Sequence, residues 1–161
     1  MATIERQNYL EATQAHRLKN DLVVARDAHN EFFELFSEHR ERLRGFEITS
    51  DPGTEDQKPQ RLLITTGCGS IKITPTFIAV ESRLCAAVLL TDEVFVNGEP
   101  ITRKLYAVTL GGHGNWVGID GETICSPAGR LDGNSAYKAV HKALSEKLRA
   151  DTEHFESFSR A

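Results

Sequence analysis

The sequence predicts an α+β domain made of a long N-terminal helix, an antiparallel meander sheet of five to seven strands, and a C-terminal amphipathic helix packed on the sheet. Helical periodicity fills residues 1–45, β-branched segments separated by glycine turns fill 61–126, and helical periodicity returns over 134–159. A chain of 161 residues is the size of one domain with one core. We therefore expect a single domain over residues 1–161.

The N-terminal helix is predicted from residues 1–45, which hold no proline and only one glycine, Gly45, where a helix C-cap belongs. At about 1.5 Å per residue such a helix would be about 60 Å long and would overhang the domain. Either it breaks near residue 20, where Asn20 would end one helix and Asp21 cap the next, or a second copy of the chain buries the overhang.

A repeat of apolar residues with alternating spacings of three and four runs through the possible break without a change of phase. This is the heptad pattern of a coiled coil, so the homodimer is the favoured alternative. The predicted interface residues are Leu18, Leu22, Ala25, His29, Phe32, Phe36 and Leu43.

Two histidines, His29 and His39, interrupt this repeat. If they are buried in the interface, they would become charged near pH 6 and weaken it. The sequence favours the other interpretation, in which they are partly exposed polar residues at the edge of the contact.

Residues 49–60 are predicted to form a polar loop, because they contain two prolines and a glycine without apolar periodicity. In the strand-rich part that follows, Pro75 cannot donate a ladder hydrogen bond, which predicts an edge strand or a bulge there. Asn97-Gly98 and Asp120-Gly121 are typical hairpin turns. The C-terminal helix over 134–159 shows apolar residues at spacings of three, four and seven.

The glycine-rich segment TLGGHGNWVGID, residues 109–120, contains His113, Asn115 and the only tryptophan, Trp116. It lacks the third glycine of a dinucleotide fingerprint, and strand-like residues follow it, so it is predicted to turn between strands. Trp116 is interpreted as a core or interface anchor. Cys68 lies in a second glycine-rich turn, and it would meet His113 only if both turns lie at the same end of the sheet.

Other chemistry has little support. The six histidines show no metal-ligand spacing and the three cysteines form no C-x-x-C pair, so we predict no metal and no cofactor. Adjacent strand residues point to opposite faces, so Asp92 and Glu93 are interpreted as turn and surface charges rather than as a catalytic pair.

Several classes of partner and location are disfavoured as well. A net charge of −4 argues against nucleic-acid binding. No apolar run reaches the roughly 18 residues of a membrane helix, and the first residues lack the layout of a signal peptide. We expect a cytoplasmic protein.

These observations favour a non-enzymatic protein–protein interaction module, such as an adaptor, a chaperone-like protein, an inhibitor or a regulator. It would form a homodimer through its N-terminal helix and bind another protein. The alternative is a small-ligand-binding protein or a cysteine-dependent enzyme, with a pocket near Cys68 and His113 that Asn115 and Trp116 help to line.

Overall fold

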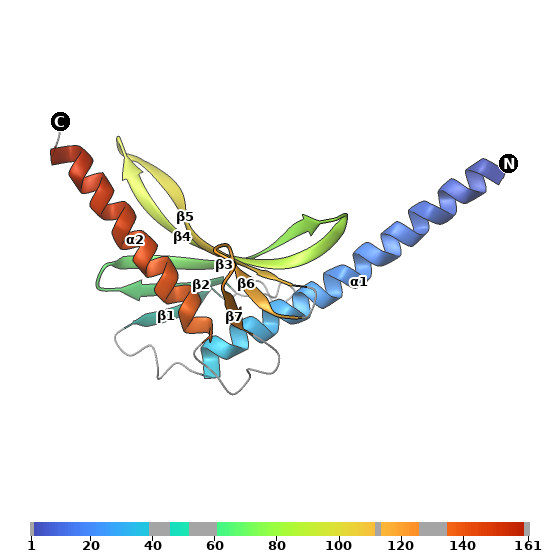
Figure 1. The fold of residues 1–161 in the computed structure, drawn as a ribbon, viewed down its shortest axis with the longest axis horizontal. Coiled ribbons are helices and arrows are strands. Elements are labelled where there is room, and N and C mark those ends of the chain that lie inside the picture. The colour runs from blue at the N-terminus through green and yellow to red at the C-terminus, as the bar shows by residue number, and fades with distance from the viewer. Residues whose placement is uncertain (1, 39–45, 52–60, 112–113, 126–134, 160–161) are drawn as a thin grey trace.

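The computed structural model describes residues 2–38, 46–51, 61–111, 114–125 and 135–159. Two helices flank a run of strands in the chain, as the sequence predicts (Figure 1). The elements are α1 (Ala2–Glu38), β1 (Glu47–Asp51), β2 (Arg61–Thr66), β3 (Gly69–Val80), β4 (Arg83–Val96), β5 (Glu99–Leu110), β6 (Trp116–Gly118), β7 (Thr123–Cys125) and α2 (Ser135–Ser159).

The strands form one seven-stranded antiparallel sheet in the order β1-β2-β3-β4-β5-β6-β7, which confirms the predicted meander. Every strand pairs with its neighbours in the chain. The turn between β4 and β5 is made by Asn97 and Gly98, both with positive φ, as that dipeptide predicts.

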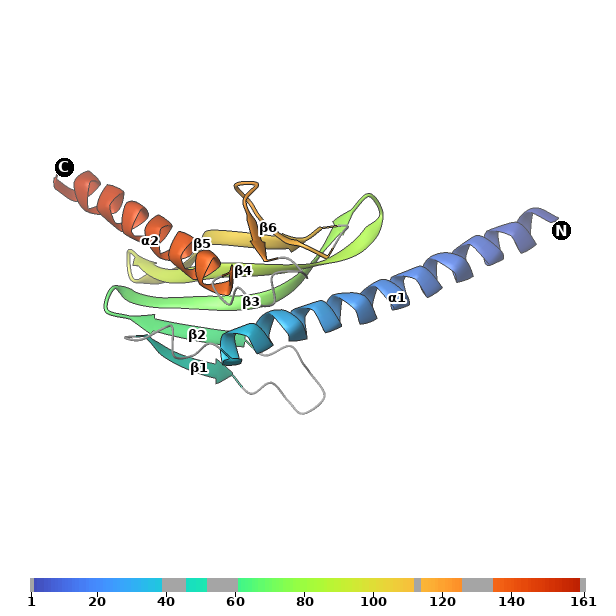
Figure 2. The same cartoon turned by 60° about the horizontal axis from the view of Figure 1, so that its bottom comes forward.

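One face of the sheet carries the hydrophobic core. Alternate residues of neighbouring strands are buried opposite one another, as in the pairs Leu62 with Ile73 and Ile64 with Ile71. Both helices cover this face and contribute to the same core, α1 through Phe32 and α2 through Val140 among others. They lie over different parts of the sheet (Figure 2). We call the face opposite to the two helices the open face.

Two details of the sheet test the sequence prediction. Strand β1 includes residues 49–51, so the prediction that the polar loop begins at residue 49 is wrong. The strand lies at the edge of the sheet, where it pairs with β2, and Ile48 packs against the core while Thr49 is exposed. Pro75 is at an edge, as predicted: β2 pairs with β3 as far as Ile73, and from Pro75 onward this side of β3 has no strand partner among the described residues.

Helix α1 is continuous, and the alternative of a break near residue 20 is wrong. Asp21 does not cap a second helix. Its carboxylate instead accepts two hydrogen bonds from Arg83, of 2.9 and 2.6 Å, and one of 3.2 Å from the backbone N–H of Leu84. Asp21 therefore lies within α1, and its side chain joins this helix to the start of β4.

Asp21 divides α1 into two parts with different surroundings. The anchored segment, Asp21–Phe33, packs on the sheet and buries Ala25, His29 and Phe32 to 2 % exposure or less. The projecting segment, Ala2–Asn20, extends away from the sheet in both views for about 28 Å at about 1.5 Å per residue (Figures 1 and 2). Neither helix, over the described residues, has the length and apolar character that crossing a membrane requires.

Candidate functional site

Cys68 and the glycine-rich turn lie at opposite ends of the sheet. Successive turns of a meander alternate between its two ends, and the β2–β3 and β5–β6 turns are three apart. Lys72 pairs with Thr91 and Thr109 pairs with Ala87. The two turns, which lie beyond these pairs, are therefore more than about 13 Å apart along β4.

Cys68 and His113 could form a pair only if both turns lay at the same end of the sheet. The structure does not meet this condition. His113 itself lies outside the described residues. Cys68 is exposed, and its backbone N–H donates a hydrogen bond of 3.0 Å to Thr66 Oγ1, which in turn donates to the carbonyl of Gly69. This is the hydrogen bonding of an ordinary tight turn.

Trp116 and Asn115, the other two residues predicted to line that pocket, make contacts that stabilise the fold. Trp116 is only 4 % exposed and packs against Phe32, with ring centroids 5.0 Å apart, which confirms the interpretation of Trp116 as a core anchor. Asn115 is half-buried, and its backbone carbonyl accepts a hydrogen bond of 2.7 Å from Gly111. Neither residue faces Cys68.

The predicted interface residues divide between the two parts of α1. Ala25, His29 and Phe32 are buried against the chain's own sheet, so a second copy has no access to them in this conformation. Leu18 is 56 % exposed and Leu22 is half-buried. Leu43 lies outside the described residues, and the side chain of Phe36 is outside them too.

Besides the residues of the predicted repeat, the projecting segment and the first residues after it carry further exposed apolar side chains. Tyr9 is 73 % exposed, Val23 54 % and Val24 61 %. Leu18 and Leu22 continue the side of the helix that meets the sheet through Ala25 and His29, since the spacing of three and four is unbroken. The contact stripe of α1 thus extends beyond the sheet that it covers.

His29 is fully buried, so the favoured interpretation of a partly exposed residue is wrong. Its Nε2 lies 2.9 Å from the carbonyl oxygen of Ala87, and Nδ1 has no hydrogen-bond partner among the described residues. Burial lowers the pKa of His29, and the backbone carbonyl groups of Ala87 and Thr76 offset this only in part. The imidazole is therefore neutral at pH 7. His39 lies outside the described residues.

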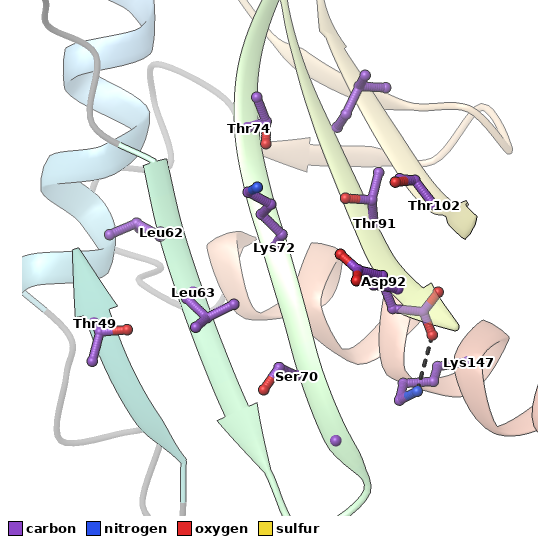
Figure 3. A pocket seen from close by; sticks show the side chains of 13 residues that line it. Thr49, Leu62, Leu63, Ser70, Lys72, Thr74, Thr91, Asp92, Thr102 and Lys147 are labelled. Atoms are coloured by element: carbon purple, nitrogen blue, oxygen red, sulfur yellow. Dashed lines mark hydrogen bonds and ion pairs between the residues drawn. The ribbon is translucent and has the colours of Figure 1, made fainter. Parts of the chain in front are cut away.

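The open face of the sheet contains a trough with a volume of about 970 Å³. Threonine and serine hydroxyls, an exposed lysine and two leucines line it (Figure 3). The residues that line its open face are Thr49, Leu63, Ser70, Lys72, Thr74, Leu89, Thr91, Glu93 and Thr102.

The trough reaches a buried ion cluster at one end. Pairing of β3 with β4 stops at Lys72 and Thr91, and Lys147 of α2 reaches the space beyond this pair. The absence of a side chain at Gly69 makes room for it, since a Cβ there would lie 3.0 Å from Lys147 Cε. Lys147 Nζ donates a hydrogen bond of 2.9 Å to Asp92 Oδ2.

Asp92 is the centre of this cluster, and the interpretation of Asp92 as a surface charge is wrong, because its side chain is only 1 % exposed. Arg103 donates to both of its carboxylate oxygens, at 2.9 and 2.5 Å, and also to Asp151 at 2.7 Å. Burial alone would raise the pKa of Asp92, but the hydrogen bonds from Arg103 and Lys147 outweigh it and lower the pKa. We call Asp92, Arg103, Lys147 and Asp151 the Asp92 cluster.

A signal in the sequence was available for Asp92. Ala86, Val88 and Leu90 are fully buried at alternate positions of β4, and Asp92 is the next position in the same period of two. Glu93 is exposed, so the prediction that the two carboxylates point to opposite faces is confirmed.

A second cluster connects α2 to the segment after β6. The Tyr106 hydroxyl donates a hydrogen bond of 2.7 Å to Asp120, and Lys142 of α2 forms ion pairs with Asp120 and Glu122. Burial, and then the hydrogen bond to Asp120, raise the pKa of Tyr106 to about 12. Gly118 is required here, because a Cβ would lie 1.8 Å from the Tyr106 hydroxyl oxygen.

Both clusters connect α2 to the sheet, and within each cluster the charges are mutually paired. Within the part of the chain that the structure describes, no group of three histidine, cysteine or acidic side chains could hold a metal ion. In comparisons with known proteins, no family model, no curated protein and no solved structure matches this chain.

Proposed function

We propose that this protein is a non-enzymatic interaction module that self-associates through the projecting segment of α1 and the exposed residues next to it. The observation that carries the proposal is a helix that leaves its own sheet while its contact stripe continues, with Leu18 exposed to 56 %. Most helical stability in proteins comes from packing of an apolar face, so packing against a partner would stabilise this segment. Full burial of a leucine side chain contributes about 1.5–3 kcal/mol.

Replacing Leu18 with aspartate is expected to dissociate the homodimer, because the new carboxylate would be buried without a partner in an apolar contact. The residue is exposed in the single chain, so the fold itself should tolerate the change. Size-exclusion chromatography with light scattering, over a range of protein concentrations, measures the result. We expect a dimer mass for the unaltered protein and a monomer mass for Leu18→Asp.

Asn20→Asp is the matched control for this experiment. It adds the same charge two residues later, on the other side of the helix, at an exposed position. It should leave the dimer mass unchanged. A monomer mass for the unaltered protein, or a dimer mass for Leu18→Asp, would show that the projecting segment does not mediate self-association.

We propose further that the module binds another protein in the cytoplasm. Large apolar side chains are exposed at the tip of the β4–β5 hairpin, at Phe95 (68 %) and Ile101 (46 %), and on α2, at Phe155 (73 %) and Phe158 (72 %). Exposed apolar residues of this size, where they form a patch, mark contact surfaces. Support for a cytoplasmic location comes from the sequence composition alone.

A second candidate function is the binding of a small molecule in the trough of the open face. Its support is the volume of about 970 Å³, with hydroxyl groups around Leu63 and Leu89, directly beside the turn that holds Cys68. Clefts of this size accommodate small ligands.

Native mass spectrometry of the protein purified from its host tests this candidate. A bound small molecule is expected on the unaltered protein and should be lost from Leu63→Trp, because the indole would fill the trough. Thr123→Trp, at an exposed position of β7 outside the trough, is the control and should retain it. An unmodified mass for the unaltered protein would contradict this candidate.

A further inference from the structure

The contact between α1 and the sheet is centred on a titratable residue that the proposed function does not use. His29 lies in the middle of the anchored segment, fully buried, with its ring 5.2 Å from that of Phe77 on β3 and 6.2 Å from that of Trp116 on β6. From β4 it meets the carbonyl of Ala87, which fixes one ring nitrogen as a donor. The other nitrogen, Nδ1, has no hydrogen-bond partner in the described chain.

No charged side chain in these surroundings would compensate a second proton on the ring. The groups that favour the charged form are backbone groups of Ala87 and Thr76, and no charged side chain of the described residues contributes to the lowered pKa. On the elements packed against His29, Asp21 of α1 is bound to Arg83 of β4, and Asp92 of β4 is bound in its own cluster. The remaining charged side chains of these elements whose exposure the structure describes are Glu11, Arg17, Lys19, Arg26, Asp27, Glu31 and Glu34 on α1, Lys72 on β3 and Glu93 on β4, and all are exposed.

We propose that protonation of His29 releases the anchored segment of α1 from the sheet, while the sheet and α2 remain folded. A charged imidazole would have to leave the pocket formed by Phe77, Trp116 and the Ala87 carbonyl in order to be solvated. Phe32 is one helical turn further along the same side of α1 and would leave with it. The pH of the surroundings would thereby control whether this apolar face of the sheet is covered.

The two helices differ in how they respond to acid. Carboxylates hold α2 through Asp92, Asp120, Glu122 and Asp151, and the pKa of each is lowered by hydrogen bonds from lysine or arginine. They remain charged at pH 5 to 6. The pair that joins α1 to Arg83 through Asp21 also survives, but Arg83 is 59 % exposed and such a pair contributes little. Only the α1 contact contains a buried histidine among the described residues.

The direction of the pH effect follows from the lowered pKa of His29. Above about pH 6.5, the ring is neutral in both the docked and the released state, so docking does not depend on pH. Below it, the released state binds a proton that the docked state does not, and the equilibrium shifts toward release. The shift is about tenfold per pH unit until the pKa of the docked state is reached.

Hydrogen exchange measured by mass spectrometry on the full-length protein at pH 7.5 and pH 5.5, corrected for intrinsic exchange rates, tests this proposal. Peptides that cover Ala25–Phe33 should exchange up to about tenfold faster at pH 5.5, whereas peptides from β2, β3 and α2 should not change. Trp116 emission should shift to longer wavelength over the same range, since Phe32 and His29 cover its ring. Parallel acceleration in all peptides would mean global unfolding and would overturn the proposal.

Variants at two histidines, His29 and His16, assign the effect to His29. His29→Gln can still donate to the Ala87 carbonyl but does not titrate, so its α1 exchange should be equal at the two pH values. His16→Gln removes an exposed histidine of the same helix and should behave as the unaltered protein does. If the His29→Gln variant does not fold, His29→Phe gives a second variant that does not titrate at this position. A pH response that persists in the folded His29 variant would overturn the proposal.

The same measurement distinguishes this inference from the proposed function. The Leu18→Asp variant should show the same pH response in Ala25–Phe33, because the contact of His29 lies within one chain. Failure of self-association would thus leave the pH response intact. Likewise, absence of the pH response would leave the test of self-association unaffected.

Discussion

Replacing Asp92 with alanine is expected to lower the free energy of unfolding by about 3–5 kcal/mol, because it removes the buried carboxylate of the cluster and leaves Arg103 and Lys147 paired only with the more exposed Asp151. Lys147 is 8 % exposed and Arg103 21 %, and Asp92 is the buried carboxylate that they share. Asp151 cannot replace it, because its side chain is 42 % exposed and lies on α2. Urea denaturation, followed by circular dichroism, measures the change.

The neighbouring Glu93→Ala is the control for this prediction, since it removes a carboxylate from the same strand on the exposed side. It should change the free energy of unfolding by less than about 0.5 kcal/mol. A triple variant, Asp92→Leu with Arg103→Met and Lys147→Met, should recover most of the loss, because apolar residues replace the whole buried group. If Asp92→Ala and Glu93→Ala were equally stable, the cluster would not hold α2 on the sheet.

The Asp92 contribution also has a defined pH range. The folded pKa of Asp92 is lowered from its ordinary value of 3.8, so the stabilisation is complete above that value. It is lost as the pH falls further through the folded pKa. Acid therefore affects the α2 side of the core only below the range in which His29 titrates.

Replacing Phe32 with alanine is expected to lower the free energy of unfolding by about 3–5 kcal/mol, through lost burial and the cavity that remains. Phe32 is fully buried where α1 meets the sheet, and its ring contacts both Trp116 (5.0 Å) and Phe33 (5.9 Å). The same urea titration, read by Trp116 fluorescence, measures the loss and also reports on the contact itself.

Phe155→Ala is the control for this substitution, because it truncates the same side chain in a helix at a position that is 73 % exposed. Its effect on unfolding should be less than about 0.5 kcal/mol. A small effect at Phe32 would imply that α1 does not form part of the core in solution.

The elements of the fold were predictable because their side-chain periods are local properties of the sequence. The meander followed from turn dipeptides such as Asn97-Gly98, which fix a hairpin between neighbouring strands. Strand β1 was missed because its apolar alternation is limited to Phe46 and Ile48 and is followed by the polar residues 49–51. The apolar repeat of α1 was found, but a helical stripe packs equally well on a sheet or on a second helix. The sequence therefore left open whether residues such as Phe32 are buried against the chain's own sheet.

The candidate site was less predictable, because it depends on which ends and faces meet in space. The pairing of Cys68 with the glycine-rich turn failed on the alternation of turns in a meander, a rule that requires the strand order to be known. The burial of Asp92 was visible in the period of two that precedes it. Its partners Arg103 and Lys147 were not, since they come from another strand and from a helix.

The strand order also sets the order of events in folding. Each strand pairs with its immediate chain neighbour, so six consecutive pairings close without a long excursion of the chain, and hairpins of this kind form early. Docking of α1 is different: its contacts from His29 to Ala87 and from Asp21 to Arg83 span 58 and 62 residues. Because long-range contacts are slow to form, we expect the sheet to assemble first and α1 to join it afterwards, although the ribosome makes that helix before the sheet.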